Sequence, residues 1–354
     1  MSEINNGQSQ DSLSYSRKSW ITGGVLALLV ILLLLFKALF GVLLLTLAGA
    51  LFAIYFHGCA SFFRKYLHIP KGWSLAASII INIILLVVFF WFVGARLQQQ
   101  VSSLTDSLPG TISNAKTYLQ KSTIGSKALD YLNSSGNSQK TMSIAKKLFS
   151  STFGILSDVY IILLLGMFFI ASPFTYKKGI VHLLPIKAKD QGADLLDEIH
   201  TVLKNWIKGQ LFGFVFIAVL TGLGLWAIGM PLILTLALIA GLLNFVPNFG
   251  PIIALIPAGL IGLMQGTTTF ILVLCLYTLI QTVQSAVTQP LIQQKMVSIP
   301  PALIIFGQVA MGLLGGFWGV LLATPVIAII MTLVNKLYVE KQTYHKYKFE
   351  KSNG

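Results

Sequence analysis

The sequence predicts an all-α polytopic membrane protein with about eight membrane segments, two of them broken or re-entrant hairpins in the C-terminal half, and a helical extracytoplasmic cap. Three observations predict this class. The 354 residues are 55% hydrophobic and only 10% charged, which is too apolar for a soluble surface. The apolar residues gather in runs of about 20, the length of a transmembrane helix. Three prolines and a glycine interrupt one such run between Asn244 and Pro257.

Five regular spans precede that interruption. We expect them at about residues 21–36, 38–56, 75–93, 153–171 and 211–228. Lys37 separates the first two so closely that a tight helical hairpin is expected, with the lysine ammonium group reaching the membrane surface.

The C-terminal half is less regular. The apolar pieces 231–247 and 252–264 are each shorter than a full span, as is typical of re-entrant or interfacial segments. Residues 267–287 form a full span that Gln289 and Pro290 are expected to end. The last apolar run, 302–334, is interrupted by Gly312, Gly315, Gly316 and Gly319. This second interruption resembles the first.

Charge indicates how these segments are oriented. Most of the 25 lysines and arginines fall in loops on one side, which places both termini in the cytoplasm and requires an even number of spans. The predicted parts are a cytoplasmic tail (1–19), three spans (20–95), an extracytoplasmic helical cap (96–151), a fourth span (152–172), a cytoplasmic linking helix (173–208), a transport core with broken hairpins (209–336) and a basic cytoplasmic tail (337–354).

Several functional classes have no support in the sequence. We attribute the net charge of +14 to the basic loops that orient the membrane segments. Binding of nucleic acid is not expected, because no basic helix and no alternation of aromatic and basic residues occurs. The five histidines have no ligand spacing, and no phosphate-binding glycine loop is present, so we expect no enzyme, no ATP-driven pump, no metal and no cofactor. Cys59 and Cys275 are expected to be packed apolar thiols without a disulfide.

The first interruption is a candidate working site. Pro247 and Pro251 lack the N–H groups that a helix needs, and Gly250 can adopt backbone angles closed to other residues. In hydrocarbon the freed backbone groups survive only where protein surrounds them or where they line a cavity. Asn244 and Asn248 flank the break, where an amide can cap freed backbone groups, bind a polar solute, or do both.

A polar stripe runs along the span 267–287. Its residues recur at spacings of three and four, so we expect this face to look into the bundle. Interhelical hydrogen bonding and the lining of a solute path both explain such a stripe. For Gly315 and Gly319 close helix packing is favoured over a hinge. The predicted pathway comprises Asn244, Pro247, Asn248, Gly250, Pro251, Pro257, Thr278, Gln281, Gln284, Ser285, Thr288, Gln289, Gly315 and Gly316.

Acidic residues are missing from the predicted core. No aspartate or glutamate lies between Glu198 and Glu340, so the core holds no carboxylate to carry a proton or pair with a sodium ion. Asp158 is the one acid beside the bilayer. It could couple transport to an ion, or it could be a surface charge near the N-terminus of its helix.

Several motifs resemble a known family. Pro247-Asn-Phe-Gly-Pro251 with Pro257, then Gln289-Pro290, Gly315-Gly-Phe-Trp-Gly319 and Ala323-Thr-Pro325 are similar to the autoinducer-2 exporter family. The resemblance implies a bacterial inner-membrane transporter with eight membrane segments that is oligomeric. It also implies either export of autoinducer-2 or exchange of sodium or lithium for protons. Phe249 stands where this family commonly has Ile or Leu.

The leading hypothesis is a secondary transporter or facilitator in the lipid bilayer for a small neutral polar solute, with autoinducer-2 as one candidate. Amides, hydroxyls and broken helices without fixed charge motivate it. The alternatives are a sodium or lithium/proton antiporter, and a non-transporting membrane partner of envelope proteins. The predicted mechanism has the tips of two moving hairpins approaching each other near the middle of the membrane.

Overall fold

The computed structural model describes residues 6–70, 72–92, 94, 138–246, 249–293 and 300–340, and within these ranges it is helical without strands. The all-α prediction is confirmed. The elements are α1 (Asn6–Leu67), a helix at Gly72–Phe92, α4 (Ser138–Ala171), α5 (Pro173–His182), η1 (Ile186–Ala188), α6 (Lys189–Ile228), α7 (Ile233–Leu243), α8 (Phe249–Gln265), α9 (Thr267–Gln293), α10 (Pro301–Val334) and η2 (Asn335–Val339).

Six of these helices are long and apolar enough to cross a membrane, whereas α7 and α8 are shorter apolar helices. The short pair coincides with the two short pieces expected from the sequence. The predicted total of eight membrane segments stays a prediction.

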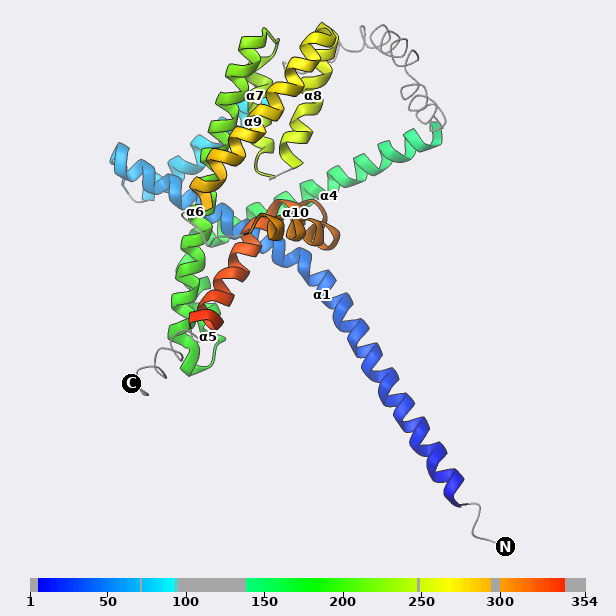
Figure 1. Cartoon of the computed structure of the whole chain (residues 1–354). Helices are drawn as coiled ribbons and strands as arrows, with labels where there is room; N and C mark the ends of the chain where they lie inside the picture. The colour runs from blue at the N-terminus through cyan, green and yellow to red at the C-terminus, as the bar shows by residue number, and fades with distance from the viewer. Residues whose placement is uncertain are drawn as a thin grey trace, which may run out of the picture.

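The hairpin expected at Lys37 is wrong. α1 is one helix of 62 residues that passes through Lys37 without interruption. No proline lies near Lys37, lysine is a good helix former, and Gly41 one turn later is accommodated within the helix, so no local signal breaks it. The apolar side chains from Ile21 to Phe36 are exposed, and this part of α1 extends away from the other helices (Figure 1).

The helix end expected at Gln289-Pro290 is also wrong. α9 continues to Gln293. Proline removes one backbone hydrogen bond and kinks a helix more often than it stops one when the flanking residues favour helix, and membrane helices tolerate it.

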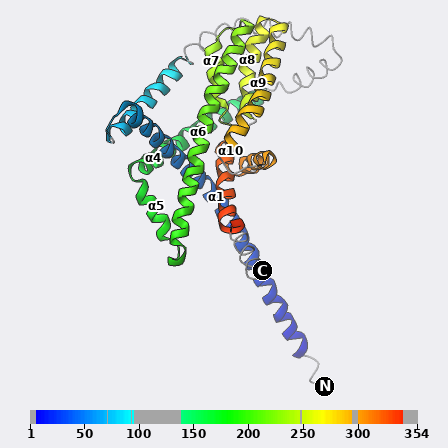
Figure 2. The same cartoon turned by 60° about the vertical axis from the view of Figure 1, so that its left-hand side comes forward.

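α6 is the central element of the fold. It is 40 residues long and buries one face along its whole length. Its C-terminal half packs with α7 and α9, while its N-terminal half contacts α1, α10 and α5. Figures 1 and 2 show it passing between these two groups of helices. The helix ends where Gly229 takes a left-handed conformation with φ of 75°, which glycine adopts without strain.

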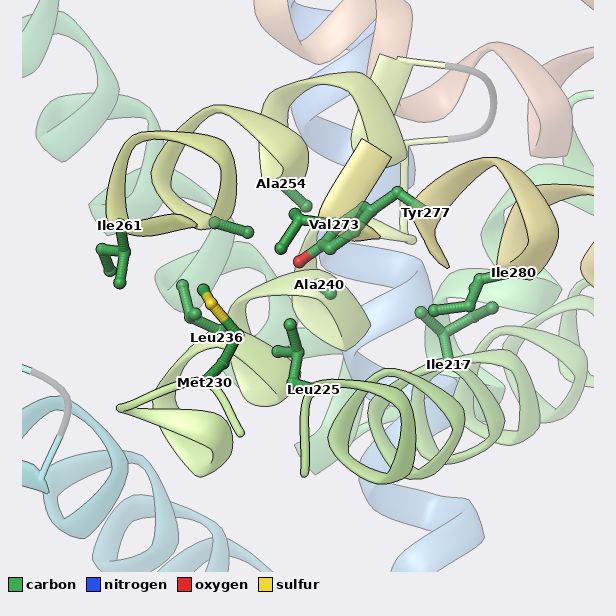
Figure 3. Close-up of a cluster of buried hydrophobic side chains, with 11 residues drawn as sticks. Ile217, Leu225, Met230, Leu236, Ala240, Ala254, Ile261, Val273, Tyr277 and Ile280 are labelled. Atoms are coloured by element: carbon green, nitrogen blue, oxygen red, sulfur yellow. The ribbon is translucent and has the colours of Figure 1, made fainter. Parts of the chain in front are cut away.

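The first core lies inside the bundle of α6, α7, α8 and α9. α6 contributes Leu225, α7 contributes Leu236, α8 contributes Ala254 and α9 contributes Val273, all almost fully buried (Figure 3). We call these four helices the α6–α9 bundle. Gly266 joins α8 to α9 with φ of 133°, a value suited to glycine.

The second core joins α1, α4, α6 and α10. Leu44 of α1, Ile162 of α4, Trp206 of α6 and Leu322 of α10 pack together there. The helix Gly72–Phe92 lies against the following part of α1, where the Tyr55 hydroxyl donates a hydrogen bond to the Asn82 side chain.

The predicted cap and tails are only partly described. Residues 96–137 of the cap lie outside the described residues, as do the ends 1–5 and 341–354. From Ser138 the chain is already helical and continues as α4 into the fourth apolar run. The linking helix is divided into α5, η1 and the first part of α6, which then crosses position 208 without interruption.

Replacing Leu236 by alanine should destabilise the α6–α9 bundle. Leu236 is 1% exposed and contributes to the first core, so Leu236→Ala leaves a cavity that costs about 2–5 kcal/mol. Thermal unfolding of the detergent-purified protein measures the loss. The matched control is Leu234→Ala on the same helix, because Leu234 is 62% exposed. An equal drop in Tm for both variants would contradict the assigned core.

Candidate functional site

The first break lies between α7 and α8, where the chain turns and satisfies much of its backbone locally. The Asn244 N–H donates to the Ala240 carbonyl at 3.1 Å, and the Val246 N–H donates to the Leu243 carbonyl at 3.0 Å. The Gly250 N–H then donates to the Val246 carbonyl at 2.8 Å. The described residues on either side of positions 247 and 248 therefore hydrogen-bond within the break rather than presenting free N–H groups. Pro247 and Asn248 lie outside the described residues.

Gly250 is required for a reason other than the one expected. Its φ is not in the left-handed region. A side chain at this position would instead overlap the Leu243 carbonyl, because α8 begins in direct contact with the end of α7. Pro251 follows in the first turn of α8, where the missing N–H has no helical partner to lose. Pro257 lies inside the same helix.

An amide pair links the first break to α9. Asn244 is 5% exposed, and its side-chain oxygen accepts a hydrogen bond from the Gln284 amide. The Asn244 side chain thus connects the end of α7 to the facing helix. Hydrogen bonds between amide side chains commonly hold neighbouring helices together in membrane bundles.

Four buried side-chain oxygens in the α6–α9 bundle have no hydrogen-bond partner among the described residues. They belong to Thr221 of α6 and to Tyr277, Gln281 and Gln284 of α9. Figure 3 shows the Tyr277 oxygen among apolar side chains of the first core. A buried polar group without a partner costs about 1–3 kcal/mol, so these oxygens are suited to bonds with water or a solute.

The polar stripe of α9 is rotated from its expected direction. Thr278 and Ser285 are exposed, and their hydroxyls donate to carbonyls of their own helix at 2.8 Å and 2.9 Å. In a single copy of the chain these two side chains therefore do not face the bundle, and the expectation that they do is wrong. The inward polar face instead comprises Tyr277, Gln281 and Gln284, spaced by four and three residues. The side chains of Thr288 and Gln289 lie outside the described part of α9.

Tyr277 is not among the site residues predicted from the sequence. Its helical spacing to Gln281 and Gln284 was a signal that could have found it. Thr221 had no comparable signal, since its neighbours on α6 are apolar.

The second break lies inside α10 at Gly316, which has φ of 58° and ψ of −135° and separates two helical arms. The arms fold back on each other: a side chain at Gly312 would lie 2.8 Å from Val320, and one at Gly319 would overlap the Met311 carbonyl. Gly315 packs on Leu44 of α1. Close packing therefore accounts for Gly315 and Gly319, while Gly316 supplies the backbone reversal.

Asp158 is joined to the second break. The Trp318 indole N–H donates to the Asp158 Oδ2 at 2.8 Å, and both groups are partly buried. α4 begins at Ser138, so Asp158 is not in the first turn of its helix. The alternative of a surface charge at a helix N-terminus is wrong.

The two breaks are not packed against each other. α10 contacts α1 and α6, and no extensive packing of α7 or α8 on α10 occurs in the described ranges. The predicted approach of the two tips near the middle of the membrane stays a prediction, because Asn248 lies outside the described residues.

The sequence profile described as AI-2E family transporter matches residues 26–338. The chain belongs to the AI-2E transporter family. This confirms the resemblance drawn from the proline, glycine and tryptophan motifs, and membership agrees with the several apolar helices long enough to cross a membrane. The chain is therefore a membrane protein of a transporter and permease family.

Several AI-2E relatives are similar over part of their length. "Putative transport protein YueF" of Bacillus subtilis (strain 168) is 25% identical over 281 residues, which cover 74% of this chain and 75% of YueF. "Putative transport protein YrrI" of the same organism is 29% identical over 158 residues, 45% of each chain. "Putative permease PerM" of Escherichia coli (strain K12) is 24% identical over 197 residues, 54% of this chain and 56% of PerM. The chain thus spans about half of YrrI and PerM, and these names specify no solute.

Replacing Gly250 by alanine should separate α7 from α8. The new methyl group would overlap the Leu243 carbonyl, and overpacking of this kind costs about 1–3 kcal/mol. We expect a Tm several degrees lower in detergent, measured by loss of monodisperse protein after heating. Gly222→Ala on α6 is the control, because its methyl group would meet the Ala237 Cβ at an ordinary 3.5 Å. A Gly250→Ala protein as stable as the control would contradict the close approach.

Proposed function

We propose that this AI-2E protein is a secondary transporter or facilitator that moves a small neutral polar solute, of which autoinducer-2 is one candidate, across the bacterial inner membrane. The observation that carries the proposal is the set of four buried oxygens on α6 and α9 that have no hydrogen-bond partner among the described residues, one of which belongs to the Asn244–Gln284 amide pair. Amide oxygens accept hydrogen bonds, and a hydroxylated solute supplies donors.

The charge of the bundle supports a neutral solute. No aspartate or glutamate lies between Glu198 and Glu340, so the described α6–α9 bundle beyond Glu198 offers amide and hydroxyl dipoles and no carboxylate. Such a lining solvates a neutral molecule without leaving a charge unpaired in hydrocarbon. The Asn244–Gln284 pair lies at the break between α7 and α8, and transporters commonly bind their substrates beside such interruptions of their helices.

The transport cycle would move the two broken segments. In this proposal the α7–α8 pair and the arms of α10 act as hairpins, and Pro247, Asn248, Thr288 and Gln289 line the same path. The exposed hydroxyls of Thr278 and Ser285 would then meet a second copy of the chain in a homo-oligomer. Both termini lie in the cytoplasm, as the basic loops favour.

A sodium or lithium/proton antiporter is the second candidate. The observation that favours it is Asp158, a carboxylate inside the apolar window Gly154–Ala171, because ionisable groups at such positions are commonly functional. A pH jump applied to sodium-loaded vesicles separates the candidates. Sodium-dependent proton movement that is lost in Asp158→Asn would support the antiporter and count against a neutral solute.

Replacing Gln281 by leucine should slow solute flux while preserving the fold. Leucine has a similar volume but no amide, so a solute loses one hydrogen bond of about 1–1.5 kcal/mol, or roughly tenfold in apparent affinity. Uptake of labelled autoinducer-2 into proteoliposomes measures this loss. The control is Thr282→Val, since the exposed Thr282 hydroxyl donates only to the carbonyl of Thr278 in its own helix.

Two outcomes would contradict the proposed function. Wild-type vesicles that move autoinducer-2 and other small polyols no faster than empty vesicles would exclude this solute class. Equal flux in Gln281→Leu and Thr282→Val would exclude Gln281 from the pathway.

A further inference from the structure

The hydrogen bond between Trp318 and Asp158 joins two distant parts of the chain. Its partners lie 160 residues apart, on α10 and α4, at a donor to acceptor distance of 2.8 Å. Asp158 forms no ion pair within the described residues, where lysines pair with Asp197, Glu198 and Glu340 instead. A carboxylate within an apolar helix is costly without a partner, and here the described partner is an indole N–H.

The bond lies directly beside the backbone reversal of α10. Gly316 has left-handed backbone angles, and Trp318 follows it two positions later. On the preceding side Gly315 packs against Leu44 and Phe40 of α1. The reversal is thus held on one side by apolar packing and on the other by a directional hydrogen bond.

These two kinds of contact differ in how they resist movement. Apolar packing allows small slides between surfaces, because dispersion contacts are individually weak and have no fixed direction. A hydrogen bond, in contrast, weakens steeply when the donor turns away from the acceptor. The Trp318–Asp158 bond therefore fixes the rotation of the second arm of α10 relative to α4.

We infer that Trp318 is a positioning residue. Its hydrogen bond to Asp158, which we call the lock, holds the Gly316 reversal of α10 against α4, and transport requires this bond to open and close. The role assigned to Asp158 is that of a hydrogen-bond acceptor rather than an ion carrier. The inference rests on the family's transport function, but it does not depend on the identity of the solute.

The lock can be tested without any solute. In a background of Cys59→Ser and Cys275→Ser, the buried Met311 is replaced by cysteine as a reporter, because Gly319 of the second arm covers its backbone. The rate of labelling by a small maleimide in proteoliposomes then reports how often the two arms of α10 separate.

Four variants separate the hydrogen bond from the charge. Trp318→Phe removes the donor and Asp158→Leu removes the acceptor, so each should raise the labelling rate at least fivefold, and the double variant should raise it no further. Asp158→Asn retains a carbonyl acceptor, so its rate should stay within about twofold of the parent. Trp226→Phe is the control, because Trp226 is 71% exposed on α6 and should leave the rate unchanged.

Other results would overturn the inference. An unchanged rate in Trp318→Phe would show that the bond does not hold the reversal. An Asp158→Asn rate as high as that of Asp158→Leu would show that the charge matters and the acceptor does not. Retained binding of antibody to the native fold, checked for each variant, excludes general unfolding as the cause. If the proposed solute is wrong, flux fails in every variant and in the parent while these labelling rates still decide the lock.

Discussion

The continuity of α6 is the constraint on which the rest of the fold depends. A helix of 40 residues that buries one face throughout must find apolar partners along its entire length. Two sets of helices supply them: α1, α4 and α10 pack around Trp206, while α7, α8 and α9 pack around Leu225. Because α6 is unbroken, it fixes the spacing between the two cores. A displacement of one core therefore shifts the other.

Both breaks satisfy their backbone groups by folding back rather than by remaining open. At the first, the described residues between Leu243 and Gly250 hydrogen-bond within the turn. At the second, Gly316 reverses the chain and brings the arms of α10 together. Among the described residues, the polar groups left for a solute are side-chain oxygens such as that of Gln281. This moves the chemistry of the site from the interrupted backbone, where the sequence directed attention, to the facing helix.

Local signals were readable from the sequence and distant pairings were not. Proline, glycine and short apolar length predicted α7, α8 and the interruption of α10, because each acts on its own turn of helix. The continuous course of α1 through Lys37 is not readable from the sequence, because two spans separated by one lysine and one long apolar helix have the same composition. The inward direction of α9 and the partner of Asp158 depend on packing between helices far apart in the chain, and for Trp318 and Asp158 no periodicity could reveal it.

Two glycine contacts affect which residues of the chain can change in evolution without changing the fold. Gly250 meets the Leu243 carbonyl, and Gly319 meets the Met311 carbonyl. At these two points the arms meet backbone to backbone, so their spacing does not depend on the shape of any side chain. Apolar residues elsewhere on the arms can be exchanged for others of similar volume. A family profile can thus span residues 26–338 while single relatives share only 24–29% identity with the chain.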